Sequence, residues 1–336
     1  MSEHRPTIHD VAARAGVSKS LVSLAMRGSP KVSSASRAAI EKAAAELGYR
    51  PNATARSLAD RRSRTIGVNM AELDNPIFPQ MLNGAHAVIR SHGYNTMLVS
   101  GALDPELEAA ELAKLLEFQV EGLILISHRL PATTVQSLSA EVPTVVLTLK
   151  EITGPGIDVV VSDDEAGARM AMQHLFDLGH EDIAHVSGGT LEPAVVREQI
   201  YRQEMDQAGF ADRIRIAEAD LTNLGGLEAA RSLLAAGPAP TAIFASNDIS
   251  AIGVMAACQE FGLSVPGDVS IIGYDGVALG ALRTLSLTTI AQPLTQMGAM
   301  AADRLFDRLN GKAVADSTIM LEPELLTRGT TAPPSR

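Results

Sequence analysis

The side chains with the plainest chemistry in this sequence are Lys19 and Ser20, which open a short stretch of helical apolar spacing. Side chains at the start of a helix can reach the edges of DNA bases when that helix lies in the major groove. Ser18, just before them, is a natural N-cap, and Gly16 can take the left-handed conformation that ends a preceding helix. The spacing therefore predicts a helix-turn-helix that reads DNA.

Two short helices have to position these side chains, and each shows an apolar stripe. The inward positions are Val11, Ala12 and Ala15 in the first helix, and Leu21, Val22, Ala25 and Met26 in the second. Ser33 or Ser34 can cap a third helix, which Gly48 closes. The alternative for this stretch is a small helical hairpin that only packs.

The segment after the third helix favours a short and marginal helix. Pro51 sets its entry, Asn52 can cap it, and residues 53–59 offer two helical turns. A helix of this length is not stable in isolation. The segment is therefore either a switch between two parts of the chain or an ordinary linker.

From Thr65 onward the pattern changes to short apolar strands alternating with amphipathic helices. Strands are expected at 65–70, 94–100, 122–127, 143–148, 182–187, 214–217, 242–246 and 269–275, and helices at 79–93, 105–118, 166–179, 194–209, 227–236 and 250–262. Buried strands joined by helices imply parallel sheets covered on both faces. About 95 residues before position 160 and about 130 after it are each one doubly wound α/β lobe. Two such lobes form a cleft that the carboxyl ends of the strands face.

Composition separates a basic module from an acidic one. The 336 residues are 46% apolar, enough for two or three structural units. Residues 1–64 carry a net charge of +7, whereas the remainder carries −18. The basic part can neutralise phosphates while the acidic body stays away from DNA.

The cysteine count and the hydropathy pattern indicate in which cellular compartment the protein is expected. Cys258 is the single cysteine, which suits a reducing environment. The sequence shows no apolar secretion signal and no long uncharged apolar run. A cytoplasmic protein without membrane contact is therefore expected.

Several residue clusters raise the alternative of an enzyme or a metal site. The carboxylates of 162–165 could hold a metal, but such clusters more often open a helix. His180 and His185 are five positions apart, which is not a helical ligand pair. The Ser-Gly-Gly of 187–189 lacks the spacing of a hydrolase nucleophile elbow, and no P-loop is present. We therefore expect no enzymatic activity, no metal and no cofactor.

Ordered motifs along nearly the whole chain resemble the LacI/GalR family of transcriptional regulators. They are D-V-A-A-R-A-G-V-S at 10–18, G-Y-R-P-N-A-T-A-R-S-L-A at 48–59, D-N-P-I-F at 74–78, V-E-G-L-I-L at 120–125, H-L-F-D-L-G-H-E-D-I-A at 174–184, F-A-S-N-D-I-S-A-I-G at 244–253, S-V-P-G-D-V-S-I-I-G-Y-D at 264–275 and L-T-T-I-A-Q-P at 287–293. The resemblance implies a periplasmic-binding-protein-like effector domain, a homodimer and a hinge helix that binds the operator.

The domain boundaries follow from this resemblance. Residues 1–50 form the all-α helix-turn-helix domain, 51–63 the hinge and 64–336 the α/β effector domain. The first lobe is expected at about 64–160 plus 291–318. The second is expected at about 161–290 plus 319–332.

The resemblance also assigns DNA-contacting residues. Lys19 and Ser20 would face bases, and the other candidates are Thr7, Ser23 and Ser33 at phosphates, His9 where the family often has Tyr, and Asn52, Ala55 and Leu58 in the hinge. Leu58 would be an apolar wedge at the operator centre. Leu24 stands where relatives often have an arginine, so it cannot make a bidentate contact with guanine. Arg27 replaces a usual asparagine and can add a phosphate contact.

For the effector, the resemblance indicates a polar cleft. Arg197 would grip a ligand oxygen, and the other candidates are Ile77, Phe78, Thr148, Leu221, Asn247, Asp275 and Gln292. A guanidinium, an amide and a carboxylate in one cleft suit the hydroxyls of a sugar. Thr148 replaces a frequent aspartate and Leu221 a frequent aromatic residue, so the effector is expected to differ from the usual sugars.

The sequence therefore predicts a repressor whose operator affinity is controlled by a small polar effector, a sugar or a sugar derivative. The expected partners are a near-palindromic operator, the effector and a second copy of the chain. Ligand is expected to release DNA, with corepression as the alternative. No terminal heptad run supports a tetramer. The rival function, a solute-binding protein of a sugar transporter, predicts a signal peptide and no basic helix-turn-helix.

Overall fold

The computed structural model describes residues 6–50, 62–148, 152, 154–312 and 317–335. The chain divides into two compact units, Met1–Arg64 and Thr65–Arg336. The expected hinge residues Asn52, Ala55 and Leu58 lie outside the described residues. No described helix combines the length and the apolar character needed to cross a bilayer.

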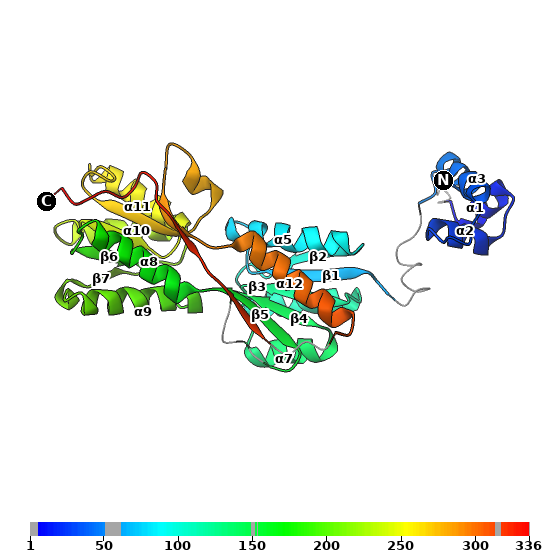
Figure 1. Ribbon diagram of the computed structural model, residues 1–336, viewed down its shortest axis with the longest axis horizontal. Coiled ribbons are helices and arrows are strands. Elements are labelled where there is room, and N and C mark those ends of the chain that lie inside the picture. The colour runs from blue at the N-terminus through cyan, green and yellow to red at the C-terminus, as the bar shows by residue number, and fades with distance from the viewer. Residues whose placement is uncertain (1–5, 51–61, 149–151, 153, 313–316, 336) are drawn as a thin grey trace. The chain divides into compact units, whose positions relative to one another are not determined.

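The described residues of the first unit form three helices (Figure 1): α1 (Ile8–Ala15), α2 (Lys19–Met26) and α3 (Ser34–Leu47). The local signals act as expected, since Gly16 ends α1 with φ 66° and the Ser18 hydroxyl accepts a bond from the Leu21 amide at 3.2 Å. Ser33, rather than Ser34, is the N-cap of α3. The helices enclose a small core that includes Val11, Val22, Ala25, Ile40 and Ala44.

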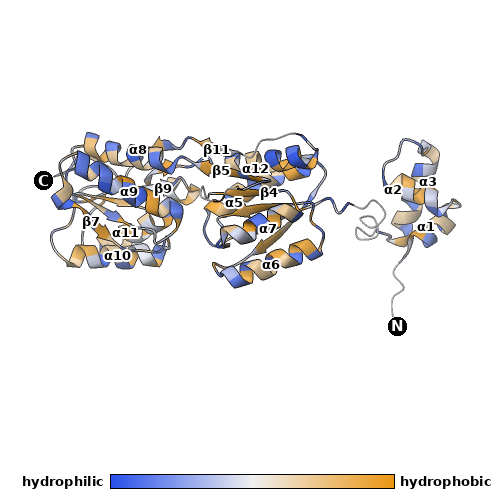
Figure 2. Ribbon diagram, turned by 90° about the horizontal axis from the view of Figure 1, so that it is seen from below, coloured by the Kyte–Doolittle hydropathy of each residue, from blue (hydrophilic) through white to orange (hydrophobic). Residues whose placement is uncertain are grey.

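The second unit begins with a lobe built on a six-stranded parallel sheet in the order β11-β5-β4-β3-β1-β2. Its strands are β1 (Thr65–Met70), β2 (Asn95–Ser100), β3 (Gly122–Ile126), β4 (Thr144–Leu147), β5 (Ile157–Ser162) and β11 (Thr318–Leu321). Helices α5 (Ile77–Ser91) and α12 (Leu294–Leu309) share a core with one face, and α6 (Pro105–Glu117) and α7 (Ala132–Glu141) share a core with the other. Figure 2 shows apolar strands between more polar helix surfaces.

The second lobe repeats this layering on a sheet in the order β12-β10-β9-β8-β6-β7. Its strands are β6 (Ile183–Val186), β7 (Arg215–Ala217), β8 (Ala242–Ala245), β9 (Ser270–Asp275), β10 (Thr288–Ala291) and β12 (Glu324–Leu326). One face packs against α8 (Asp164–Asp177) and α9 (Glu192–Gln207), and the other against α10 (Asn223–Ala235) and α11 (Asp248–Glu260). Two 3-10 turns, η1 (Ala211–Arg213) and η2 (Ala278–Ala281), lie in its loops. β12 pairs antiparallel with β10, so this sheet is not wholly parallel as expected.

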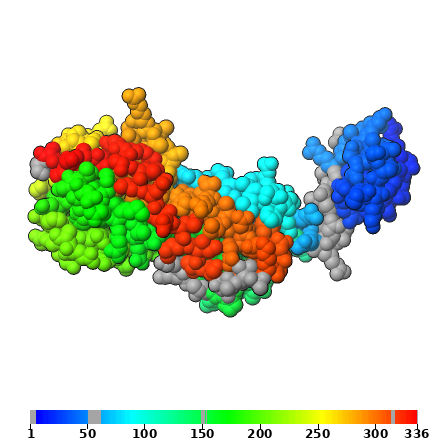
Figure 3. All heavy atoms as spheres, in the orientation of Figure 1, coloured from blue at the N-terminus to red at the C-terminus, as the bar shows by residue number. Residues whose placement is uncertain are grey.

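The chain passes between the two lobes three times: after β5, between β10 and α12, and between β11 and β12. The alternating pattern in the sequence ends at Asp275 and does not indicate α7, β5, α12 or the last three strands. In Figure 3 the C-terminal segment, drawn in red, lies at the surface of both lobes. Three segments therefore connect the two lobes.

Helices α5 and α12 approach closely through two glycines. A Cβ on Gly298 would lie 1.8 Å from the backbone oxygen of Met81, and one on Gly84 would lie 1.9 Å from that of Thr295. Neither position has room for a methyl group. This contact ties the last helix to the first lobe and brings the end of β10 to the cleft.

Candidate functional site

The outward face of α2 carries polar side chains at the start of the helix. At 100° per residue, Lys19, Ser20, Ser23 and Arg27 fall within about 100° of one another around the axis. Lys19, Ser20 and Arg27 are exposed, and Ser23 is half-buried. The Arg27 guanidinium donates to the Ser23 hydroxyl at 2.8 Å. The four residues therefore form one polar face opposite the buried side chain of Ala25.

The other expected DNA contacts in the described residues lie at the surface of the first unit. His9 is exposed on α1, and the Thr7 hydroxyl donates to the Asp10 carboxylate at 2.7 Å. The Ser33 hydroxyl accepts from the Ser36 amide at 3.2 Å. Thr7 and Ser33 therefore already serve as helix caps, and any contact with phosphate would share those hydroxyls.

Two arginines of this unit have structural partners that the sequence did not reveal. Arg37 donates to the backbone oxygens of Ala25 at 3.0 Å and Ser29 at 2.7 Å, at the end of α2. Arg14 forms an ion pair with Glu46 at 2.8 Å. Carbonyl partners leave no trace in a sequence, and the count of positive charge therefore overstates the number of side chains that face outward.

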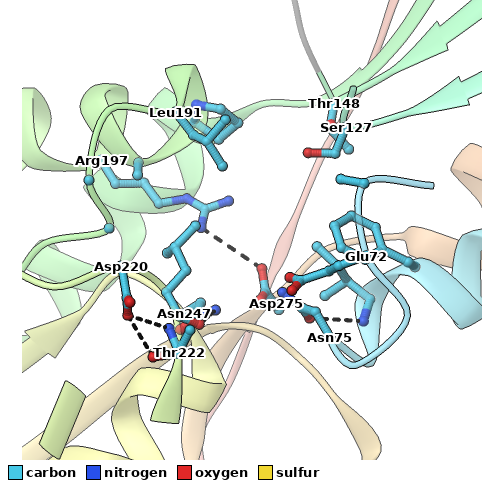
Figure 4. A pocket seen from close by; sticks show the side chains of 18 of the residues that line it. Glu72, Asn75, Ser127, Thr148, Leu191, Arg197, Asp220, Thr222, Asn247 and Asp275 are labelled. Carbon is cyan, nitrogen blue, oxygen red and sulfur yellow. Dashed lines mark hydrogen bonds and ion pairs between the residues drawn. The ribbon is translucent and has the colours of Figure 1, made fainter. Parts of the chain in front are cut away.

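A cavity of about 250 Å³ lies between the two sheets of the second unit. It is lined by all eight residues expected at the effector site: Ile77, Phe78, Thr148, Arg197, Leu221, Asn247, Asp275 and Gln292. They come from seven separate segments of the chain. Figure 4 shows Arg197 and Asn247 on one side, Thr148 and Glu72 on the other, and Asp275 between them. The fold thus gathers residues from both lobes around one polar space.

Arg197 is held in place by its own lobe. Its Nε and Nη2 donate to Asp164 Oδ1 at 3.0 and 2.7 Å, and its Nη1 donates to the Ser246 carbonyl at 2.7 Å. Its guanidinium carbon lies 3.6 Å from the ring centre of Tyr274. Three of the five N–H groups of Arg197 therefore bind described protein atoms, and two are left for a ligand. Asp164, which the sequence placed at a helix start, is the residue that orients this arginine.

Asp275 is the most unusual carboxylate in the cavity. Its backbone has φ 114°, and its side chain accepts from Gln292 Nε2 at 2.7 Å. Burial raises its pKa to about 7, although the charge of Arg197, 3.9 Å away, opposes that rise. The neighbouring Asp248 accepts bonds from the Val277 amide at 2.8 Å and the Thr289 hydroxyl at 2.6 Å, which fixes the turn after β9.

Backbone contacts shape the rest of this wall. Asn247 caps α11 by accepting from the Ser250 amide at 2.8 Å, and it donates to the Leu221 carbonyl at 3.0 Å. Leu221 has φ 66°. A Cβ on Gly188 would lie 2.4 Å from Leu221 Cδ2, so the Ser-Gly-Gly stretch provides packing space beside the cavity. Asn247 therefore links two loops and aligns the cavity wall.

Several residues that line the cavity were not expected there. They include Glu72, Ser127, Arg129, Ser162, Asp164 and Asp220. Burial raises the pKa of Glu72, and the adjacent Asp74 adds to the rise. Most of these residues follow the ends of strands β1, β3, β5 and β7. Position after a buried strand was the signal that could have identified them.

The residues weighed as metal ligands have other partners. Asp163 caps α8 by accepting from the Ala166 amide at 3.0 Å. His180 bonds to Thr241 and to the Ala332 carbonyl, and His185 bonds to the Phe244 carbonyl at 2.9 Å. In the described parts of the chain, no three His, Cys, Asp or Glu side chains are grouped as a metal site requires.

Comparisons with known proteins assign the two units. Residues 7–52 match the family described as "Bacterial regulatory proteins, lacI family", and residues 172–331 match "Periplasmic binding protein-like domain". Catabolite control protein A of Priestia megaterium is 34% identical over 320 residues, which cover 94% of this chain and 96% of that protein. The regulatory match rules against a transporter's solute-binding protein.

Solved structures agree along the chain. The lac repressor dimer bound to operator and the anti-inducer ONPF has a TM-score of 0.87 at 29% identity, covering 98% of this chain and 100% of that chain. A LacI family transcriptional regulator from Enterococcus faecium with bound ribose has a TM-score of 0.74 at 29% identity, covering 80% of this chain and 99% of that chain. This chain belongs to the lacI family of bacterial transcriptional regulators.

Proposed function

We propose that this protein is a homodimeric repressor that binds a near-palindromic operator through residues 1–50. A small polar effector, a sugar or a sugar derivative, occupies the cavity between the lobes and lowers operator affinity. The observation that carries the proposal is that cavity, lined from both lobes by paired charges and amides. The lac repressor dimer bound to operator and the ribose-bound regulator support the same assignment.

In this proposal the outward face of α2 meets the DNA. Lys19 and Ser20 contact base edges, whereas Arg27 and Ser23 contact phosphates, and base contacts set the sequence preference. Selection from random DNA should return a near-palindrome, because a two-fold dimer presents the same face twice. Lys19→Ala should change the selected sequence. Arg27→Ala should weaken binding to all sequences and flatten its salt dependence. A changed consensus sequence in Arg27→Ala would contradict the assignment of Arg27 to phosphate contacts.

The effector is bound by charge-assisted hydrogen bonds to Asp275 and to the two remaining donors of Arg197. Such bonds contribute roughly 1.5–3 kcal/mol each. Asp275→Ala should therefore lower effector affinity at least tenfold by calorimetry. The ligand itself is found by a thermal-shift screen of sugars and related metabolites, since a ligand of the folded state raises the melting temperature. Unaltered effector affinity in Asp275→Ala would show that the ligand binds elsewhere.

The coupling between the two activities runs through the hinge, where Asn52, Ala55 and Leu58 contact the operator. The decisive experiment titrates effector with and without operator DNA. If the two sites are linked, the effector weakens operator binding by some factor, and the operator must weaken effector binding by the same factor. Equal effector affinities would refute the coupling, and tighter binding with operator would show corepression. A regulator with this function acts on the chromosome in the cytoplasm, and we assign no enzymatic reaction to the cleft.

A further inference from the structure

The two walls of the cavity differ in how far their polar atoms are satisfied. On the second lobe, Arg197, Asn247 and Gln292 all bond to protein atoms. On the first lobe, two buried polar atoms, Arg129 Nε and Thr148 Oγ1, have no hydrogen-bond partner in the described part of the chain. Ser162 Oγ also has no hydrogen-bond partner there, and this residue is only 5% exposed. The unsatisfied atoms therefore gather on one wall.

These atoms lie in order along three neighbouring strand ends. Arg129 follows β3, Thr148 follows β4 and Ser162 ends β5, and the sheet order is β5-β4-β3. Adjacent strands are about 4.8 Å apart, so the row of three strand ends spans about 10 Å. All three residues line the cavity. Buried polar atoms without partners are rare in folded proteins, which points to a ligand as the missing partner.

The backbone of Arg129 is fixed while its guanidinium is available. Its amide donates to Glu108 Oε2 at 2.8 Å, and Glu108, which is 1% exposed, also accepts a bond from Asn69. Arg129 Nε is buried without a hydrogen-bond partner among the residues that the structure describes, and the residue lines the cavity. The main chain of Arg129 is therefore anchored at the cavity, while the Nε donor of its side chain is left for a ligand.

The other charges of the cavity are accounted for. Asp164 and Asp275 both face Arg197, at 2.7 and 3.9 Å. Asp220 is exposed and accepts from the amide and the hydroxyl of Thr222. Arg129 is the remaining cation, and Glu72 is the remaining carboxyl group. The charge of Arg129 opposes the rise in the pKa of Glu72 and of Glu108, but neither carboxyl group forms an ion pair with it. A ligand that closes the lobes removes water from Arg129, and an anionic group on that ligand would give the guanidinium a direct partner.

From this arrangement we infer that the effector is an anionic sugar derivative whose carboxylate or phosphate binds Arg129. The planar guanidinium matches either anion through two parallel hydrogen bonds. Thr148 and Ser162 bond to neighbouring oxygens of the ligand, and the sugar hydroxyls face Asp275 and Asn247 on the other lobe. The inference rests on the proposed effector site and specifies its ligand class.

The test compares matched ligands by calorimetry on the full chain. Two series serve: D-glucose, D-gluconate and D-glucose 6-phosphate, and D-ribose, D-ribonate and D-ribose 5-phosphate. At least one anionic member should bind ten times more tightly than its neutral parent, and the carboxylate and phosphate arms identify which anion is used. Sodium acetate and inorganic phosphate at the same ionic strength should not reproduce the binding.

Failure of this inference differs from failure of the proposed function. Preference for a neutral parent, or no binding by any anionic member, overturns the anionic assignment. If a neutral sugar then releases operator DNA, the proposed function still stands. If no ligand found in the wider sugar and metabolite screen changes operator binding, the proposed function fails too.

Two charge variants make the test specific to Arg129. Arg129→Gln should weaken the anionic ligand at least tenfold and change the affinity of the neutral parent less than twofold. Glu72→Gln removes a repulsive charge and should strengthen the anionic ligand. Arg202→Gln, a surface variant of α9 with the same charge change, should leave the anionic-to-neutral affinity ratio unaltered. Equal losses for both ligands in Arg129→Gln, with an unchanged melting temperature, would overturn the charge-pairing role.

Discussion

The buried carboxyl group of Asp275 makes the stability of the empty protein depend on pH. Its side chain is 2% exposed, and burial raises its pKa from 3.8 to about 7 despite the opposing charge of Arg197. Between pH 3.8 and about pH 7, Asp275 therefore holds a proton in the folded state that it has lost in the unfolded state. The stability that this group contributes is therefore present at low pH and is lost as the pH rises through about 7.

Asp275→Asn tests this reasoning, because asparagine resembles the neutral acid and keeps an acceptor for Gln292. The rise in pKa corresponds to a penalty of up to ~4 kcal/mol for the ionised side chain. We expect the variant to be roughly 1–4 kcal/mol more stable than the parent at pH 8, or several degrees in melting temperature. The difference should shrink toward zero near pH 4, where Asp275 of the parent is itself the neutral acid.

Urea unfolding from pH 4 to pH 8 measures the difference directly. Asp248, whose pKa burial raises to about 6, is present in both proteins, and its charge is one cause of the raised pKa of Asp275. Asp220→Asn removes an exposed carboxylate from the same cavity and should change stability by no more than ~0.5 kcal/mol. A variant less stable than the parent at pH 8, or a gain that does not vary with pH, would refute the account of Asp275.

Three further changes probe the contacts that hold the sites in place. Arg37→Ala should destabilise the first unit by about 1–3 kcal/mol, because the last carbonyls of α2 lose their donor, and the melting of that unit followed by circular dichroism measures the loss. Gly298→Ala should cost at least ~2 kcal/mol in urea unfolding, since the added carbon meets the Met81 carbonyl; an unchanged midpoint would mean that α5 and α12 separate freely. Asp248→Ala should weaken effector binding as well as stability, because the turn after β9 loses its anchor; calorimetry that shows wild-type affinity would contradict this role.

Local features of the chain could be predicted from the sequence because their causes are local. Gly16, Ser18 and Gly48 end or begin helices through their own backbone freedom or their own hydroxyl groups, which act within four residues. The apolar runs of the strands likewise reflect burial on both faces of a sheet. The helix-turn-helix and the two α/β lobes are therefore visible in the sequence, whereas the antiparallel pairing of β12 is not.

The tertiary structure decided how the cleft residues interact. Arg197 and Asp164 are 33 positions apart, and Gln292 is 17 positions from Asp275, yet each pair forms hydrogen bonds. The sequence placed Arg197 in the cleft through resemblance, but only the fold shows that Asp164 binds two of its five donors. It also leaves the Nε of Arg129, at the cavity, without a hydrogen-bond partner among the described residues. The reason is physical: hydrogen bonds and burial between distant loops depend on how the sheets stack, and residue spacing along the chain carries no record of that stacking.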